Sequence, residues 1–149
     1  MPEPILRVLA FDFGLRRIGI ATGDSLTGTA APRPAAPARE GEPDWEQIGR
    51  EMRAFNPGRV VVGAPYNADG TAGALLPHAR RFAAEIKRRF ALPVSLVDER
   101  FSSLEASDVL KTRRARGERR RLRREQIDSA AAAVILERWL SGEPGEELP

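Results

Sequence analysis

Two short apolar runs joined by a tight turn constrain the fold of this chain more than any other feature of the sequence. They lie within residues 7–14 and 17–24, and the turn from Gly14 to Arg17 is typical of a hairpin. The first run has no polar face beyond Asp12, so we expect a strand that is covered on both sides. A carboxylate there is unusual unless it is paired or bound to a metal ion. The alternative is an aspartate that only helps to form the turn ahead of Gly14.

Helical and strand patterns alternate along the rest of the chain. We expect a third strand within residues 27–38, which its three prolines push to a sheet edge or into a loop, and a loop over 38–43. Later strands are expected at 59–63 and 92–97. Helices are expected from an N-cap at Asp44 to about residue 56, at 74–90 and at about 125–140. This order predicts a mixed α/β sheet with two parallel crossovers in a single domain, residues 1–142, followed by a disordered polar tail, residues 143–149.

The charge is distributed unevenly along the chain. There are 24 basic and 21 acidic residues, which gives a net charge of +3. Nine of the basic residues and one acid, Glu118, fall between Lys111 and Arg124; this basic segment carries +8 and leaves fifteen basic and twenty acidic residues, or −5, elsewhere. A basic segment on an acidic body indicates a polyanionic partner. The alternative is a solvated, partly helical surface stretch, although so dense a run of like charge suits a loop that orders on nucleic acid.

Two further carboxylates stand out. Glu99 follows the strand expected at 92–97, at the edge where sites form in α/β sheets, and its alternative role is a salt bridge with Arg100. Asp128 shares a helical stripe with the apolar residues at 131, 132, 135 and 139, so we expect it on the face that packs against the sheet. Its alternative role is to complement the helix dipole in the first turn. Asp98 alternates with Glu99 across the strand, so the two cannot point to the same face.

Asp12, Glu99 and Asp128 are therefore expected to converge at one edge of the sheet. Crowded carboxylates repel one another, and divalent cations relieve that repulsion. The chain has no Cys and one His, which excludes thiolate sites and a His-rich zinc site and leaves Mg²⁺ or Mn²⁺ as the expected cofactor. Metal ions held in this way support phosphodiester hydrolysis. Three acids beside an arginine-rich segment thus indicate a nuclease.

The same residues, in this order, resemble the YqgF (RuvX) family of the RNase H-like superfamily, which is related to the Holliday junction resolvase RuvC. Each matching piece is weak alone, and their combination over about residues 8–140 is specific. Ala64-Pro65 stands where resolvase relatives carry an acid after the fourth strand. The matching pieces are Phe11-Asp12-Phe13-Gly14 with Arg17-Ile18-Gly19-Ile20-Ala21, Val61-Val62-Gly63-Ala64-Pro65 with Asp69-Gly70, Asp98-Glu99-Arg100-Phe101-Ser102-Ser103 with Ala106, and Asp128-Ser129-Ala130-Ala131 with Ile135-Leu136.

The resemblance implies an RNase H-like fold, with a five-stranded mixed sheet in the order 3-2-1-4-5 and helices on both faces. It also implies a cytoplasmic, metal-dependent nuclease that matures the 5′ end of pre-16S ribosomal RNA, with Holliday junction resolution as the older proposal for the family. The metal ligands of the superfamily would fall on Asp12, Glu99 and Asp128. The residues expected to hold phosphates are Arg17, Arg100, Lys111, Arg113, Arg114, Arg116, Arg119, Arg120, Arg121, Arg123 and Arg124.

Other functions stay open at the level of the sequence. The basic segment also fits a nucleic-acid-binding ribosome-assembly factor without catalysis. A phosphate-binding fragment of the actin and sugar-kinase type shares the D-x-G hairpin, but those proteins use two such domains, and the chain has no G-x-x-x-x-G-K-[ST] loop.

Structured RNA and branched DNA are both open as partners, because phosphate contacts carry no sequence information. A homodimer would suit a two-fold junction. No apolar run approaches the roughly 18 residues of a membrane span, and the absence of Cys suits the cytosol.

Overall fold

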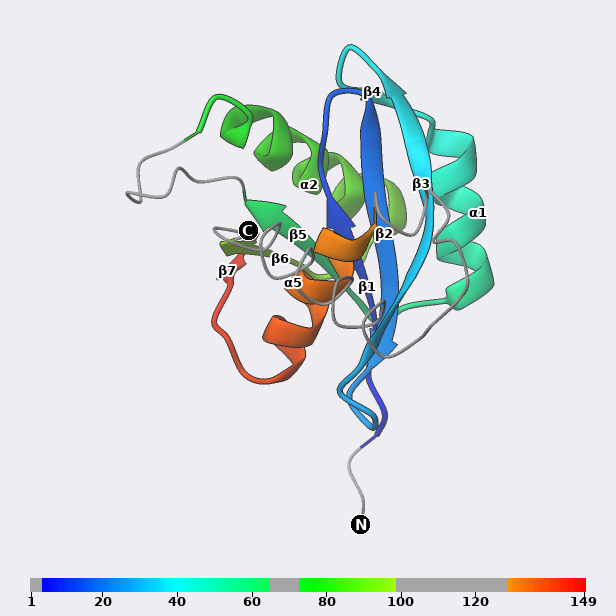
Figure 1. Cartoon of the computed structure of the whole chain (residues 1–149), viewed down its shortest axis with the longest axis vertical. Coiled ribbons are helices and arrows are strands. Elements are labelled where there is room, and N and C mark those ends of the chain that lie inside the picture. Colours follow the sequence, from blue (N-terminus) through cyan, green and yellow to red (C-terminus); the bar gives the residue numbers. More distant parts are fainter. Residues whose placement is uncertain (1–3, 65–72, 99–128) are drawn as a thin grey trace, which may run out of the picture.

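A single mixed sheet organises the molecule (Figure 1). The computed structural model describes residues 4–64, 73–98 and 129–149. Within them the sheet runs in the order β4-β3-β2-β1-β5-β6-β7. The strands are β1 (Arg7–Asp12), β2 (Arg17–Asp24), β3 (Ala30–Arg39), β4 (Glu42–Pro43), β5 (Arg59–Ala64), β6 (Val94–Asp98) and β7 (Glu146–Glu147), and the helices are α1 (Trp45–Phe55), α2 (Leu76–Phe90) and α5 (Ala130–Leu140).

The strand directions confirm the predicted topology. β1 pairs antiparallel with β2 and parallel with β5, and β5 pairs parallel with β6, so α1 and α2 are the two expected crossover helices. β3 lies beyond β2 and antiparallel to it. Without the two-residue strands β4 and β7, the five main strands lie in the order β3-β2-β1-β5-β6, which is the predicted order 3-2-1-4-5. In the part of the chain that the structure describes, the sheet has seven strands because a two-residue strand is added at each edge.

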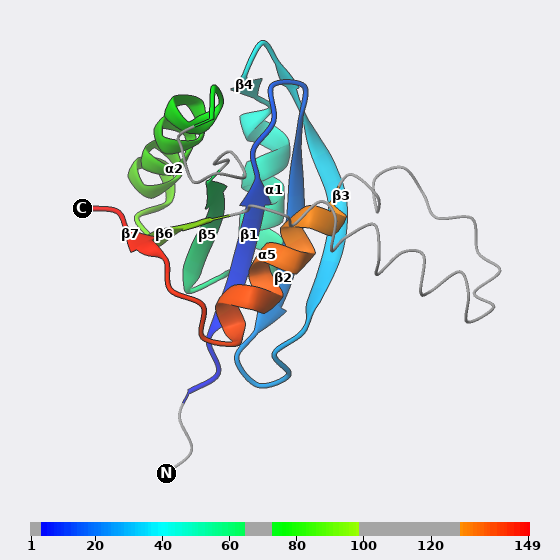
Figure 2. The same cartoon turned by 60° about the vertical axis from the view of Figure 1, so that its left-hand side comes forward.

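The central strands are buried on both faces, as the uninterrupted apolar run of β1 predicted. Leu9 and Phe11 of β1 belong to the core beneath α1 and α2, whereas Val8 and Ala10 belong to the core beneath α5. Figure 2 shows α5 lying across one face of the sheet, with α1 and α2 on the other. Side chains alternate along a strand, so the two cores define the face to which each polar residue of the strand belongs.

Local signals determine where the helices begin and end. The side chain of Asp44 accepts hydrogen bonds from two backbone N–H groups of the first turn of α1, at 3.1 and 3.2 Å, which confirms the predicted N-cap. The helix ends at Asn56, whose backbone is left-handed with φ 53°. α2 begins at Leu76, two residues later than predicted, and carries Pro77 in its first turn, where the missing N–H costs nothing. None of the described helices is long and apolar enough to cross a membrane.

The loop predicted over residues 38–43 is wrong, because this segment contains a hairpin. β4 pairs with the end of β3 through Ala38↔Pro43 and Arg39↔Glu42. The two turn residues between them, Glu40 and Gly41, have φ values of 52° and 83°. Consecutive positive φ values are typical of the tightest hairpin turns. A glutamate seldom adopts positive φ, so the composition of this turn did not indicate a hairpin.

Residues 143–149 include a strand of the sheet rather than forming the predicted disordered tail. β7 pairs antiparallel with β6 through Ser95↔Glu147 and Leu96↔Glu146. Glu147 pairs with Arg59 at 2.7 Å and Glu146 pairs with Arg80 at 2.8 Å. The segment is short, acidic and polar, so it has no strand pattern of its own. Its order comes from the edge of β6 and from two arginines that are distant in the sequence.

Candidate active site

Asp12 is the last residue of β1, the strand at the centre of the sheet, and it lies opposite Gly19 of β2. Alternation along the strand places its half-buried side chain on the face of α5, together with Val8 and Ala10. β1, β5 and β6 run parallel, and their carboxyl-terminal ends form what we call the carboxyl edge. Ligands of open α/β sheets bind outside this edge, so Asp12 occupies the position at which a functional carboxylate is expected.

The turn that follows Asp12 requires a glycine. A Cβ atom on Gly14 would lie 2.5 Å from the carbonyl oxygen of Arg17, closer than any side chain can approach. Arg17, which was predicted to contact phosphate, is the first residue of β2 and is exposed. The turn therefore carries a half-buried carboxylate at its start and an exposed guanidinium group at its end.

Asp98 ends β6 at the same edge but belongs to the opposite face of the sheet. Its backbone lies beside Ala64, the last residue of β5. Leu96, two residues earlier, belongs to the core beneath α1 and α2, whereas Val97 belongs to the core beneath α5. Asp98 therefore shares a face with Leu96, and Asp12 lies on the other face with β5 between the two strands.

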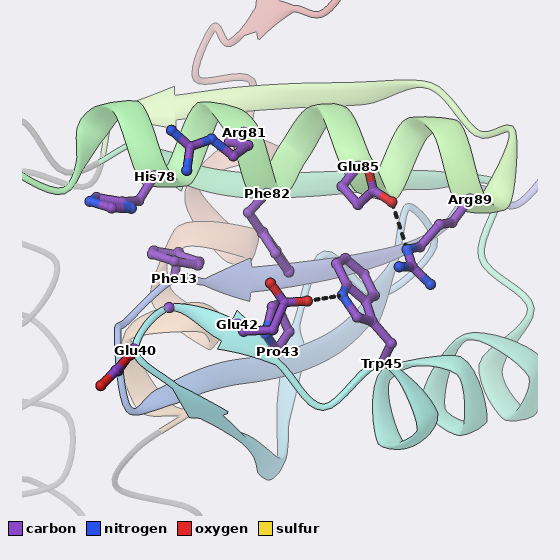
Figure 3. A pocket seen from close by; sticks show the side chains of 11 residues that line it. Phe13, Glu40, Glu42, Pro43, Trp45, His78, Arg81, Phe82, Glu85 and Arg89 are labelled. Atoms are coloured by element: carbon purple, nitrogen blue, oxygen red, sulfur yellow. Dashed lines mark hydrogen bonds and ion pairs between the residues drawn. The ribbon is translucent and has the colours of Figure 1, made fainter.

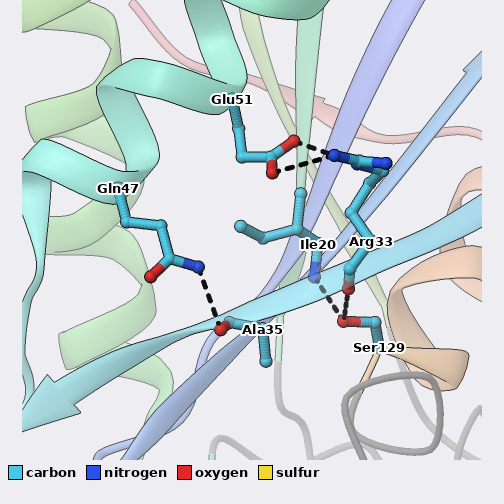
Figure 4. A network of polar contacts seen from close by, with 6 residues as sticks. All are labelled: Ile20, Arg33, Ala35, Gln47, Glu51 and Ser129. Atoms are coloured by element: carbon cyan, nitrogen blue, oxygen red, sulfur yellow. Dashed lines mark hydrogen bonds and ion pairs between the residues drawn. The ribbon is translucent and has the colours of Figure 1, made fainter. Parts of the chain in front are cut away.

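Ser129 attaches the start of α5 to the sheet (Figure 4). Its side chain is fully buried. The hydroxyl accepts a hydrogen bond from the backbone N–H of Ile20 at 3.0 Å and donates one to the backbone carbonyl of Arg33 at 2.6 Å. Ile20 and Arg33 are paired residues of β2 and β3, next to a bulge at which β3 carries one more residue than β2. The hydroxyl thus bridges two backbone groups of neighbouring strands where the regular ladder is disturbed.

This bridge determines where α5 begins relative to the carboxyl edge. Ile20 follows Gly19, and Gly19 is the residue paired with Asp12. The predicted packing of the α5 stripe on the sheet is confirmed for Ala132 and Ile135, which are fully buried. No role for Ser129 was predicted from the sequence. The available signal was a hydroxyl residue directly before a run of four alanines on a face expected to be buried.

Most of the predicted site residues lie outside the described residues. Of the three predicted metal ligands, the structure describes Asp12 and not Glu99 or Asp128. The convergence of the three carboxylates therefore stays a prediction. Within residues 4–64, 73–98 and 129–149, no group of three or more His, Asp or Glu side chains is placed to hold a metal ion. Residues 125–127 of the predicted last helix also lie outside the described ranges. The predicted site residues outside these ranges are Glu99, Arg100, Lys111, Arg113, Arg114, Arg116, Arg119, Arg120, Arg121, Arg123, Arg124 and Asp128.

Comparison with known proteins places the chain in a family. Residues 6–142 match the model of a family described as "RuvX: Holliday junction resolvase". The chain is 46% identical over 132 residues to a protein of Glaesserella parasuis and to one of Salmonella paratyphi B, both named "Putative pre-16S rRNA nuclease". Each alignment covers 89% of this chain and 94% of the relative.

Solved structures share the fold. RuvC of Thermus thermophilus, solved in complex with a Holliday junction substrate, matches with a TM-score of 0.56 and 18% identity over 96% of this chain and 99% of that chain. The yeast mitochondrial Holliday junction resolvase matches with a TM-score of 0.52 and 12% identity, over 94% of this chain and 80% of that chain. These likenesses confirm the predicted RNase H-like fold. Since the family model and close relatives also span most of the sequence, the chain belongs to the RuvX (YqgF) family.

Proposed function

We propose that this protein is a metal-dependent nuclease that hydrolyses phosphodiester bonds during 5′-end maturation of pre-16S ribosomal RNA. The observation that carries the proposal is the position of Asp12, a half-buried carboxylate at the carboxyl edge of the central strand. The 46% identity to relatives named "Putative pre-16S rRNA nuclease" supports the choice of substrate.

The donor chemistry at this edge fits a hard divalent cation. Asp12 offers carboxylate oxygens, the chain has no thiol, and its one imidazole, His78, belongs to α2 on the other side of the sheet. Mg²⁺ and Mn²⁺ prefer oxygen ligands of this kind. We assign the metal-holding role to Asp12, Glu99 and Asp128. When bound, Mg²⁺ or Mn²⁺ supplies Lewis-acid activation of a water nucleophile and stabilises the charge on the leaving oxygen.

Two observations support a meeting of Glu99 and Asp128 with Asp12. The positions of β6 that share the face of α5 are 95 and 97, and 99 is the next position of the same parity. Asp128 directly precedes Ser129, whose hydroxyl is fixed beside Ile20, and consecutive Cα atoms are about 3.8 Å apart. Two strand spacings of about 4.8 Å separate β1 from β6, so a carboxylate that follows β6 in the sequence would have to bridge about 10 Å to meet Asp12.

The basic side chains near these carboxylates are proposed to bind the nucleic acid. Arg17 lies on the same turn as Asp12, and Arg100 follows Glu99 directly in the sequence. We assign these two arginines and the basic segment to the sugar–phosphate backbone, which they would position without reading its sequence. Guanidinium groups suit this role because they bind phosphate through two parallel hydrogen bonds.

A matched pair of variants tests the proposal. Asp12→Asn keeps the size of the side chain and removes its charge, so we expect cleavage of a pre-16S rRNA leader in Mg²⁺ or Mn²⁺ to be abolished while RNA binding is retained. Asp98→Asn makes the same change at the same edge on the opposite face, and we expect it to leave cleavage largely intact. Metal-dependent cleavage by purified Asp12→Asn at the wild-type rate would refute the role of Asp12.

Holliday junction resolution is a second candidate function. The description of the matched family and the fold shared with RuvC favour it. Parallel time courses on a pre-16S rRNA leader and on a four-way DNA junction, with the same enzyme preparation, separate the two substrates. Sedimentation of the protein on the junction would show whether two copies bind, as a two-fold symmetrical junction requires. Binding without cleavage of either substrate, in any divalent metal, would instead support an assembly factor without catalysis.

A further inference from the structure

A cavity of about 360 Å³ lies between α2, the β3–β4 turn and the start of α1 (Figure 3). Its volume is within the range of small-molecule sites. One wall contains Phe13, the residue directly after Asp12. Phe13 belongs to the core beneath α1 and α2, whereas Asp12 belongs to the α5 face. The cavity therefore starts one residue beyond the candidate catalytic carboxylate, on the other side of the sheet.

Aromatic rings form much of the cavity wall. Phe13 and Phe82 are almost fully buried, at 5% and 4% exposure, and their ring centroids are 5.4 Å apart. The imidazole of His78 lies parallel to the ring of Phe13 within 5°, at a centroid distance of 6.4 Å. Trp45 stacks on Phe82 at 5.7 Å. His78 and Trp45 are only half-buried, so the aromatic wall continues from the core to the solvent side of the cavity, where the guanidinium group of Arg89 lies 4.2 Å from the centroid of the Trp45 ring.

The rim of the cavity carries charged groups of both signs. Three carboxylates, from Glu40, Glu42 and Glu85, line the cavity together with the guanidinium groups of Arg81 and Arg89. Glu85 accepts a hydrogen bond from Arg89 at 2.8 Å. Arg81 is exposed and makes no hydrogen bond or ion pair with the described residues. Carboxylates outnumber guanidinium groups, which disfavours a simple anion, and a purely apolar ligand would strip water from these charges.

The ligand that fits this lining is neutral, flat and rich in hydrogen-bonding groups. An unpaired nucleobase has these properties, since it stacks on aromatic side chains and exchanges hydrogen bonds along its edges. We propose that the cavity is a subsite for one unpaired nucleobase of the nucleic acid. The identity of the polymer rests on the proposed function, whereas binding of the base itself does not require cleavage.

The subsite is connected to the turn that carries Asp12. The N–H of Gly41, in the β3–β4 turn, donates a hydrogen bond to the carbonyl of Leu15 at 3.0 Å. A Cβ atom on Gly41 would lie 3.2 Å from Cδ2 of Leu15 and 4.0 Å from Nδ1 of His78. The rim of the cavity therefore packs directly on the turn between β1 and β2. A base held in the cavity would keep the nucleic-acid strand that carries it at the carboxyl edge.

The one histidine of the chain provides a specific probe. The imidazole proton resonances of His78 are followed by NMR, without divalent metal, during titration with AMP, GMP, CMP, UMP and ribose 5-phosphate. We expect saturable shifts with at least one nucleotide and none with ribose 5-phosphate, because the base is the recognised part. No shift with any nucleotide, or an equal shift with ribose 5-phosphate, would overturn the proposal.

Calorimetry on variants then tests whether the nucleotide binds in the cavity. The ligand is the nucleotide that causes the largest shift of the His78 resonances. We expect His78→Ala to weaken binding about tenfold and His78→Phe, which keeps a ring, to retain most of it. Arg50→Ala, on the exposed face of α1 and away from the cavity, is the matched control and should bind as the wild type does. Unchanged binding by His78→Ala would place the nucleotide elsewhere and overturn the proposal.

The same titration on Asp12→Asn separates this inference from the proposed function. We expect Asp12→Asn to bind the nucleotide with wild-type affinity, because Asp12 lies on the opposite face of the sheet. A protein that binds the base and cleaves no substrate would contradict the nuclease alone. A protein that cleaves normally while His78 responds to no nucleotide would contradict the subsite alone.

Discussion

The hydroxyl of Ser129 lies 3.0 Å from the backbone nitrogen of Ile20, although 109 positions separate the two residues in the sequence. Ile20 is next to Gly19, and Gly19 is paired with Asp12. The contact therefore relates the start of α5 to the end of β1. It makes two distant stretches of chain neighbours at the carboxyl edge, which is what the proposed joint action of Asp12 and Asp128 requires.

Ser129→Ala should destabilise the protein by about 1–3 kcal/mol, because it leaves a buried N–H group and a buried carbonyl without their partner. Urea unfolding measures the change in the free energy of unfolding. Ser141→Ala is the control, since the hydroxyl of Ser141 donates to the carbonyl of Arg138 at an exposed site; we expect a change within about 0.5 kcal/mol. Equal losses in the two variants would contradict a special role for Ser129.

Gly14→Ala should distort the turn that carries Asp12, because the added methyl group meets the Arg17 carbonyl oxygen at 2.5 Å. We expect a loss of about 1–3 kcal/mol in the free energy of unfolding, together with reduced cleavage. The comparison variant is Gly49→Ala in α1, where the nearest atom, 3.0 Å away, belongs to the flexible side chain of Arg53. That change should be neutral or stabilising, since alanine favours a helix. A Gly14→Ala protein as stable as Gly49→Ala would show that the turn can relax.

The attachment of β7 should depend on pH. Hydrogen bonds from the guanidinium group of Arg59 and then from the hydroxyl of Ser95 hold the pKa of Glu147 below its ordinary value of 4.5. A lowered pKa means that Glu147 stabilises the fold above the unfolded value and that this contribution is lost as the pH falls through the folded value. Glu147 is 57% exposed, so screening limits the contribution to less than about 1 kcal/mol.

Glu147→Gln should therefore flatten the decline in stability between pH 5 and pH 3, roughly the interval around the ordinary glutamate pKa. The midpoint of urea unfolding, followed across that interval, measures the effect. Glu46→Gln is the control because Glu46 forms an exposed pair with Arg50 at 3.7 Å on the surface of α1. Identical pH profiles for wild type and Glu147→Gln would show that the Arg59 contact does not hold β7 in solution.

Two substitutions in the basic segment, Arg120→Gln with Arg121→Gln, should weaken nucleic-acid binding. Each phosphate contact that is lost should reduce the slope of log K against log salt concentration by about 0.9 on duplex DNA, or about 0.7 on a single strand. Filter binding over a series of salt concentrations gives the slope. Arg50→Gln with Arg53→Gln removes the same charge from the exposed face of α1 and should leave the slope unchanged. Equal slopes for the two double variants would indicate a contribution from net charge alone.

Local patterns account for the features of the fold that were predicted correctly. The apolar runs of β1, β5 and β6 predicted buried strands, and Asp44 predicted the start of α1, because these signals act over a few consecutive residues. The hairpin at Glu40 and Gly41 was missed because a glutamate seldom adopts positive φ. The strand at β7 was missed because two residues carry no periodic pattern, and their order depends on contacts with Arg59 and Arg80.

The sequence by itself predicted the alternation of strands and helices, the start of α1 at Asp44 and a carboxylate, Asp12, in a strand covered on both sides, whereas the strand order came from the family resemblance. Only the tertiary structure decided that Asp12 shares a face with α5 while Asp98 faces away, and that Ser129 joins α5 to β2 beside the carboxyl edge. The reason is physical. Propensity and periodicity act between near neighbours in the chain, whereas the face of a strand and the partner of a buried hydroxyl depend on register and packing between residues that the sequence keeps far apart.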